Sequence, residues 1–241
     1  MATPLDQFAI STIGPVVTVE GFPLALTNSA LAMLASCALL MVLVRMALRR
    51  PALVPNHSQS IAEQVYLFVA QMVEDNAGTK AKPYFPLILT LFMLILFGNM
   101  LGMVPGSFTF TSHISVTFAL ASFVFLFVTA VGFYKHGLRF LSLFIPKGVP
   151  ILMLPLMIVI ELISYLSRPI SLALRLFANM MAGHIMLKVF AGFVFTLGAA
   201  GVFPLIINVA LTGFEFLIAF LQAYVFAVLS CLYLSDALNL H

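Results

Sequence analysis

The 241-residue sequence is poor in charge, lacks tryptophan and contains only two cysteines. Charged residues make up 8% of it, whereas soluble domains carry about 25%. Hydrophobic residues make up 63%, and the mean hydropathy is +1.16. The shortage of charge therefore excludes an ordinary soluble protein and predicts that lipid covers most of the chain.

Other absences narrow the function. Cys37 and Cys231 lie in separate apolar runs, so neither a disulfide nor a metal site is predicted. No P-loop, Ser-His-Asp arrangement or Cys/His metal spacing is present. We therefore expect no cofactor and no covalent catalysis by this chain itself. The Lys and Arg residues form no dense run, so no nucleic-acid partner is expected, and residues 1–23 do not read as a signal or transit peptide.

Long apolar runs predict an all-α polytopic membrane protein with about five membrane helices and one amphipathic surface helix. A bilayer core about 30 Å thick needs roughly 20 apolar residues of helix. Residues 61–77 alternate apolar and polar faces at helical spacing and are expected on the membrane surface. With no internal repeat, residues 1–241 are predicted to form a single membrane domain. The predicted membrane helices are 24–48, 84–104, 114–134, 149–195 and 202–236.

The basic residues predict an orientation. If the helices alternate in direction, eight of the eleven Lys and Arg residues fall on one side, and the opposite loops, 105–113 and 196–201, contain none. The positive-inside rule places the basic side in the cytoplasm or mitochondrial matrix. The amino terminus is then outside and the carboxyl terminus inside, in a bacterial inner (plasma) membrane or a mitochondrial inner membrane. The eight residues are Arg45, Arg49, Arg50, Lys80, Lys82, Lys135, Arg139 and Lys147.

The last two apolar runs are too long for upright spans. Residues 149–195 would form a helix about 70 Å long, more than twice the hydrocarbon thickness. Either two short spans turn near residues 167–169, or one long helix is strongly tilted. Two short spans would move the uncharged 196–201 loop to the inside, so the charge distribution favours the tilted helix. Residues 202–236 are also overlong, and a tilted antiparallel hairpin is predicted.

Ionisable residues recur at regular spacing in these two runs. Seven-residue steps keep side chains on nearly one helix face. His184 is nine residues beyond Arg175, on the opposite side and about 13 Å further along. The polar set in the first run is Glu161, Arg168, Arg175 and Asn179, and that in the second is Asn208, Glu215, Gln222 and Asp236.

Arg175 is the residue most in need of an explanation. No acidic residue lies within four positions, and a permanently protonated guanidinium within a membrane costs several kcal/mol. The structural alternative is an arginine that extends toward the membrane surface or forms a static pair with Glu215. An unpaired Glu161 or Glu215 would take up a proton in lipid, as a relay requires, and His184 fits either a relay or a core role.

For other polar positions a structural role is at least as well supported. Arg168 is expected to anchor near the inner surface, and Lys188 to extend toward the outer one. Asn99 and His113, near the outer end of the second span, are expected to be structural. The Gly98–Gly102 spacing fits a close helix contact, although this motif is weak.

Residues 167–184, with Leu-Arg-Leu-Phe-Ala-Asn at 174–179, closely resemble subunit a of F-type ATP synthases. Glu215 followed by residues 221–226 is a second match, and residues 86–105 are a weaker third. The resemblance covers essentially residues 24–236. It implies two long tilted helices against a rotating ring of c subunits, in a complex with peripheral-stalk b subunits, other membrane-sector subunits and lipids.

The resemblance also implies roles for individual residues. Arg175 matches the arginine that faces the ring carboxylate, with Asn179 and Gln222 as polar neighbours. His184 and Glu215 match the half-channel open to the outside. Glu161 and Asp236 match the half-channel leading inside. Many bacterial relatives carry Glu and His exchanged at the outer pair, so this arrangement resembles the alphaproteobacterial and mitochondrial branch.

The expected function is therefore that of a proton-translocating stator subunit. Two alternatives from other classes stay open at this point: a secondary transporter, which usually shows internal repeats, and a non-conducting scaffold of a membrane complex.

Overall fold

The computed structural model describes residues 11–12, 17–19, 22–24, 27–48, 55–104, 107–145 and 153–239. The helices are α1 Asn28–Leu48, α2 His57–Ala77, α3 Phe85–Gly102, α4 Ile114–His136, α5 Leu154–Thr196 and α6 Val202–Leu238. Short 3-10 helices are η2 Thr79–Tyr84, η3 Phe110–Ser112, η4 Gly137–Phe144 and η6 Gly198–Gly201. Strands β1 Val17–Val19 and β2 Phe22–Leu24 pair in a small antiparallel hairpin.

Five helical segments in the described part of the chain are long and apolar enough to cross a membrane. They contain α1, α3, α4, α5 and α6, whereas α2 is the sixth helix, with one polar face. The predicted fold class is confirmed. Arg49, Arg50 and Lys147, three of the predicted basic-side residues, lie outside the described residues, as do residues 149–152 of the fourth predicted membrane helix.

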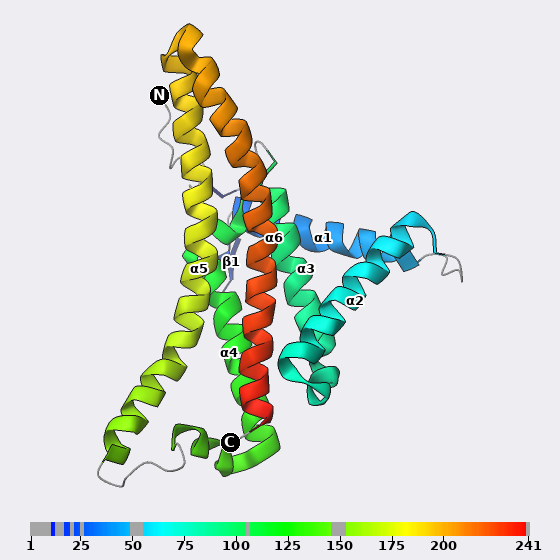
Figure 1. The fold of residues 1–241 in the computed structure, drawn as a ribbon, viewed down its shortest axis with the longest axis vertical. Coiled ribbons are helices and arrows are strands. Elements are labelled where there is room, and N and C mark those ends of the chain that lie inside the picture. Colours follow the sequence, from blue (N-terminus) through cyan, green and yellow to red (C-terminus); the bar gives the residue numbers. More distant parts are fainter. Residues whose placement is uncertain are drawn as a thin grey trace.

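Helices α5 and α6 form a long antiparallel hairpin joined through η6 (Figure 1). Helices α3 and α4 lie along one side of this hairpin, and α1 runs across its direction (Figure 1). Helix α5 is unbroken over 43 residues, about 65 Å, and α6 over 37 residues. The alternative of two short spans turning near residues 167–169 is therefore wrong, and neither long helix fits upright within about 30 Å of hydrocarbon.

The core draws residues from α2 to α6, and part of it lies where α3 packs against α6. Three fully buried alanines, Ala219, Ala223 and Ala227, recur every four residues on α6, so they line one face of that helix. Small side chains let two helix backbones approach closely, which is how helices associate in lipid. Larger buried residues of α3, such as Phe92 and Ile95, complete this contact. The site described below is built on this rigid packing.

The Gly98–Gly102 pair on α3 makes a close contact, but the partner is the segment after the helix. A Cβ atom at Gly98 would collide with the ring of Phe110, and one at Gly102 with the side chain of Thr109. The predicted helix contact is thus replaced by a fold-back of residues 109–110 onto α3. Both glycines allow this segment to lie close to the helix, and it carries Thr109 to the site.

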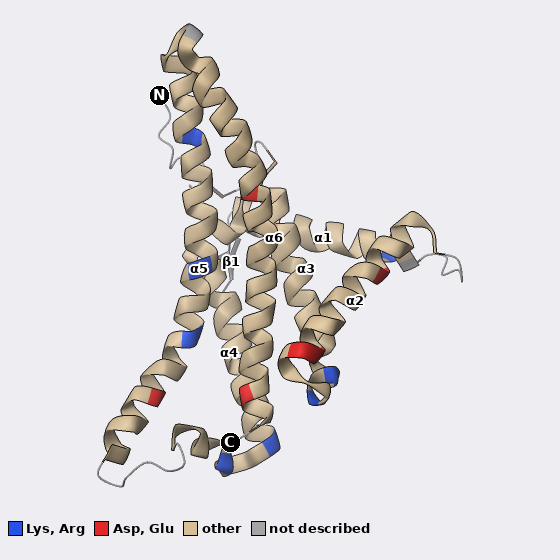
Figure 2. Ribbon diagram, in the orientation of Figure 1, with Lys and Arg blue, Asp and Glu red and all other residues tan. Residues whose placement is uncertain are grey.

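The basic residues of η2, α4 and η4 lie at one end of the molecule. Lys80 donates a hydrogen bond to the Asn239 side chain at 2.9 Å, and His136 Nε2 donates to the Leu238 carbonyl at 3.3 Å. These bonds join η2 and the end of α4 to the end of α6. The Lys and Arg residues of η2, α4 and η4 lie toward this end, whereas Arg45 lies on α1, away from it, and η6 at the other end carries none (Figure 2).

Candidate functional site

His184 and Glu215 form a buried pair between α5 and α6. His184 Nδ1 lies 2.9 Å from Glu215 Oε1, and their side chains are only 10% and 4% exposed. Such a contact is either an imidazolium–carboxylate pair or a neutral pair that shares one proton. Either state balances the charges of the two groups without a third charged group. The pair can therefore hold and release a proton within a medium that penalises isolated charge.

Thr109 contacts the other nitrogen of the same imidazole. Its Oγ1 lies 2.7 Å from His184 Nε2 and 3.2 Å from the Gly102 carbonyl oxygen. Thr109 lies just before η3 and is buried. The His184 ring is thus held at both nitrogens, by α6 on one side and by the segment before η3 on the other.

Gly183 makes room for the carboxylate. A Cβ atom there would lie 2.6 Å from Glu215 Oε1 and 2.8 Å from its Cδ. Beside it is a cavity of about 180 Å³ between α5 and α6, large enough for roughly six waters at about 30 Å³ each. Asn179, Gly183 and Glu215 contribute to its lining. Both carboxylate oxygens of Glu215 are buried and, apart from the ion pair of Oε1 with His184, lack a hydrogen-bond partner among the described residues.

Arg175 lies on α5 between two contacts with α6, the Arg168–Asp236 ion pair and the His184–Glu215 pair, and takes part in neither. It is seven residues from Arg168 and nine from His184, and it is exposed. No ion pair or hydrogen bond of its side chain occurs within the described ranges. Leu174 and Asn179 beside it are also exposed. The static pair with Glu215 is therefore absent, since Glu215 is engaged by His184.

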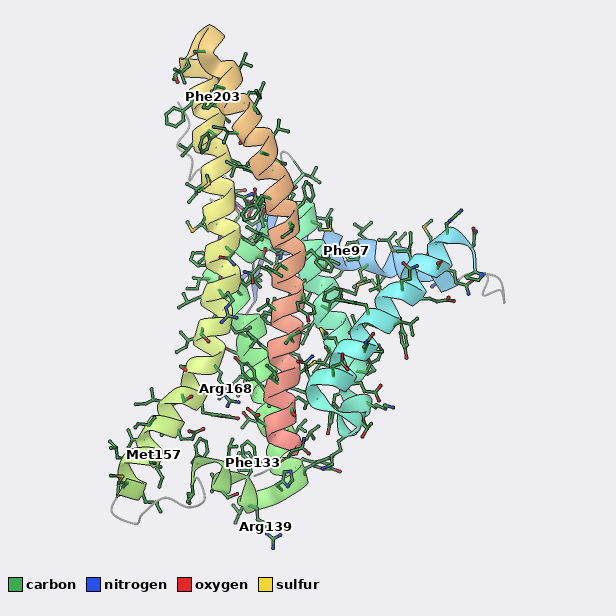
Figure 3. The ribbon with its side chains drawn as sticks, viewed as in Figure 1. Phe97, Phe133, Arg139, Met157, Arg168 and Phe203 are labelled. Carbon is green, nitrogen blue, oxygen red and sulfur yellow. The ribbon has the colours of Figure 1, made fainter. Side chains whose placement is uncertain are left out.

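Arg168, by contrast, is engaged within the chain. Its Nη1 donates to Asp236 Oδ2 at 2.8 Å. Its guanidinium also lies over the rings of Tyr165 and Tyr233, at 5.3 and 5.0 Å from their centres. Figure 3 shows Arg168 reaching from α5 toward α6. This contact set is that of a structural anchor, one of the two roles considered for Arg168.

The structure brings together some of the predicted site residues and separates others. His184 and Glu215 meet, and Asn179 lines the adjoining cavity. Asp236 meets Arg168 rather than Arg175. Gln222 is buried on α6, two turns from Glu215. Glu161 is half-buried near the start of α5 and has no ion-pair partner in the described part of the chain.

Asn99 and His113 have structural contacts, as expected. Asn99 is fully buried, donates to the Ala219 carbonyl at 3.3 Å and accepts from Thr111 at 2.8 Å. It therefore joins α3, η3 and α6. The ring of His113 stacks on Phe108 with centres 5.0 Å apart, and burial lowers the pKa of His113 from its usual value. Its carbonyl accepts from the first turn of α4.

Thr109 is a site residue that the sequence did not reveal. It is 75 residues from His184, and a lone threonine in a loop gives no periodic signal. A usable signal was the Gly98–Gly102 pair, because two glycines one turn apart mark a close approach of another segment. The fold-back onto these glycines is what brings Thr109 to the imidazole.

Comparisons with known proteins agree with this architecture. The sequence profile of the ATP synthase A chain family matches residues 30–235. The chain is similar to ATP synthase subunit a of Pelagibacter ubique (strain HTCC1062), at 55% identity with 100% of both chains covered. It is similar to the subunit a of Rhizobium etli (strain CIAT 652), at 54% identity over 98% of this chain and 97% of that one. The subunit a of Rhodospirillum rubrum is 52% identical over the full length of both. The chain therefore belongs to the ATP synthase A chain family.

Proposed function

We propose that this chain is the proton-translocating stator subunit in the membrane sector of an F-type ATP synthase. Its α5–α6 hairpin offers two offset half-channels to a rotating ring of c subunits, and coupling to the ring drives ATP synthesis. Peripheral-stalk b subunits and other membrane-sector subunits are its further partners, within a lipid bilayer. Apart from proton transfer, the chain itself is assigned no covalent chemistry, and no cofactor or metal is assigned to it.

The observation that carries this proposal is the state of Arg175. An exposed guanidinium on a lipid-compatible helix, without a carboxylate partner in the described part of the chain, needs a counter-ion from another molecule. A carboxylate on a moving ring meets this need only when it is ionised. Arg175 then favours the ionised form of each ring carboxylate that arrives, and the proton is released.

The buried pair supplies the uptake side. A proton from the outer face reaches His184 and Glu215, where the 2.9 Å contact passes it between Nδ1 and Oε1. Through the cavity lined by Asn179 and Glu215 it reaches a ring carboxylate, which is then neutral and can face lipid. Gln222, on the same α6 face, is assigned to polar contacts near the arginine.

The release side lies toward the opposite end of the hairpin. Glu161 and Asp236 are assigned to it, with Glu161 as the proton acceptor because it carries no internal partner among the described residues. Arg175 stands between the two paths and repels protons, which prevents a direct leak. Each charge that crosses gains roughly 2.3 kcal/mol per 100 mV of membrane potential.

The membrane and orientation follow from the charge distribution. The basic residues of η2, α4 and η4 lie at the end where α6 terminates, and the positive-inside rule assigns that end to the cytoplasm or matrix. The amino terminus is assigned to the outer side and the carboxyl terminus to the inner side. The three relatives named above are bacterial, which favours a bacterial inner membrane over a mitochondrial one.

Substitution of Arg175 tests this function. Arg175→Ala is expected to abolish ATP-driven proton pumping in inverted vesicles while the subunit still co-purifies with the c ring, because Arg175 makes no ion pair with any described residue of the chain. Lys188→Ala, which removes another exposed cation from α5, is the matched control and should pump at least half as fast as wild type. Coupled pumping by Arg175→Ala at the control's rate would refute the motor role. It would leave a scaffold as the better account.

A further inference from the structure

Thr109 contacts the imidazole of His184, but the proposed proton path assigns Thr109 no role. The His184 imidazole has two nitrogens, and only Nδ1 faces Glu215. Nε2 faces Thr109 Oγ1 at 2.7 Å, and Thr109 is 5% exposed. Which nitrogen of a histidine carries the proton is set by the partner of the other one. The Thr109 hydroxyl therefore lies where it can determine which nitrogen of His184 exchanges protons with Glu215.

The Gly102 carbonyl determines which nitrogen of the His184 ring carries the proton. Gly102 is the last residue of α3, where carbonyl groups have no partner within the helix. A carbonyl oxygen can only accept a hydrogen bond, so the Thr109 hydroxyl donates to the Gly102 carbonyl oxygen at 3.2 Å. The oxygen of Thr109 is then left as an acceptor for His184 Nε2–H. The proton on Nε2 is held in place, and Nδ1 becomes the exchangeable position.

We propose that Thr109 is a positioning residue for proton uptake: its hydroxyl, oriented by the Gly102 carbonyl, fixes the Nε2–H form of His184 so that Nδ1 exchanges protons with Glu215. This inference rests on the relay role proposed above for His184 and Glu215. In the step itself the Nδ1–H bond breaks and an O–H bond forms at Glu215 Oε1. The bonds at Nε2 are the same before and after, so nothing has to reorganise on the Thr109 side.

Loss of the hydroxyl leads to a specific defect. Valine has the shape of threonine but accepts no hydrogen bond, so Nε2–H would be buried without a partner, which is costly. The neutral ring then favours the form with Nδ1–H directed at the Glu215 carboxylate, a static pair in which Nδ1 can no longer take up a proton. The protonated ring also loses an acceptor, so uptake should require a more acidic outer solution.

Few other ionisable groups of the described helices lie near this ring. Glu215 faces it from α6. Helix α3 carries no ionisable side chain, and the segment through η3 ends in His113. On α5 itself Lys188 lies one turn away and Arg175 nine residues away. The ionisable groups of α4 lie at its far end, in residues 134–136. A change in the pH profile on substitution of Thr109 is therefore attributable to the Thr109–His184 contact.

The test uses the complete complex in proteoliposomes. ATP synthesis is driven by an imposed proton gradient, and the pH on the uptake side is varied. Thr109→Val should lower the rate about tenfold near neutral pH and move the pH of half-maximal rate roughly 0.5–1 unit toward acid. Thr109→Ser restores the hydroxyl and should stay within about twofold of wild type, with no movement of the profile. Rates are normalised to the subunit that co-purifies with the c ring.

Thr111→Val is the matched control. Thr111 is a buried threonine two residues away, and its hydroxyl binds Asn99 rather than His184. This change is expected to reduce assembly but to leave the rate per assembled complex and the profile unchanged. If Thr109→Val does not assemble, Thr109→Cys replaces it, because a thiol is a poor acceptor and should move the profile in the same direction.

Three results would overturn the proposal: a wild-type rate and profile for Thr109→Val, the same defect in Thr109→Ser, or the same movement in Thr111→Val. Glu215→Gln separates this failure from a failure of the proposed function. A block in Glu215→Gln with a normal Thr109→Val removes only the role of Thr109. Normal synthesis by Glu215→Gln removes the relay itself.

Discussion

At the scale of single residues, the site depends on a missing side chain as much as on those present. Gly183 precedes His184 on α5 and faces the Glu215 carboxylate. Its Cα carries only hydrogen, and this lets the carboxylate lie against the helix at the correct height for Nδ1. The glycine is therefore explained by close approach and not by an unusual backbone conformation.

Gly183→Ala should displace the Glu215 carboxylate. The added methyl would lie 2.6–2.8 Å from Oε1 and Cδ, closer than a carbon can approach without movement. Because proton transfer needs the 2.9 Å contact, ATP synthesis driven by a proton gradient is expected to fall at least about tenfold. The measurement is the synthesis rate per assembled complex.

Gly192→Ala on the same helix is the control for Gly183→Ala. A Cβ at Gly192 meets nothing within 4 Å, and alanine favours helix over glycine by about 1 kcal/mol. Its rate should equal that of wild type. An unchanged rate in Gly183→Ala would mean that the carboxylate relaxes elsewhere without loss, and that the pair geometry does not limit uptake.

Residue-level reasoning from the sequence reached part of this site. The isolation of Arg175 was predictable, because no acid lies near it along the chain and an arginine cannot lose its charge. The joining of His184 to Glu215 came from family resemblance, and the structure shows the contact. The contact with Thr109 was out of reach, because it depends on a fold-back onto α3 that helical periodicity does not encode.

At the scale of elements, α5 continues through a proline. Pro169 lies inside the helix, where it removes one hydrogen bond and its ring clashes with the carbonyl of Tyr165. Such positions kink a helix, and the early part of α5, with Met157, slants away from α6 (Figure 3). The local effect of Pro169 is therefore compatible with either a break or a bend in α5. The packing at Arg168 favours the bend.

The Arg168 contacts fasten α5 to α6 beside this bend. Arg168 reaches Asp236 and two aromatic rings, and Tyr165 also shares a 2.7 Å hydrogen bond with Thr129 of α4. Three helices therefore meet around one guanidinium. Asp236 was assigned by resemblance to the inner half-channel, and this contact gives it a second role that can be separated by experiment.

A double-mutant cycle separates the two roles of Asp236. Arg168→Gln and Asp236→Asn should each lower the thermal stability of the complex, with a coupling energy of about 0.5–1 kcal/mol, because the two side chains are 21% and 42% exposed. If Asp236 only anchors Arg168, the double variant pumps protons as well as Arg168→Gln alone. A further loss of pumping in the double variant would place Asp236 in the proton path.

At the scale of the whole molecule, length and charge together specify how the hairpin sits. Helix α5 is about twice as long as the hydrocarbon is thick, so it has to lie strongly inclined to remain covered by lipid. Helix α1 runs across the hairpin (Figure 1), as expected if α1 is closer to the membrane normal. Apolar length was readable from the sequence, whereas the angle between helices was not, because it depends on which side chains interlock.

The two ends of the hairpin should face opposite sides of the membrane. Leu138, in η4 beside Arg139, is 83% exposed at the basic end, and Leu197, between α5 and η6, is 51% exposed at the other. In a Cys37→Ala, Cys231→Ala background, an impermeant maleimide should label Leu197→Cys in right-side-out vesicles and Leu138→Cys in inverted ones. Labelling of both positions from one face would require an additional crossing between η4 and η6, which an unbroken α5 does not provide. Labelling in the reverse order would invert the chain and exchange the uptake and release sides, so the His184–Glu215 pair would open to the inside.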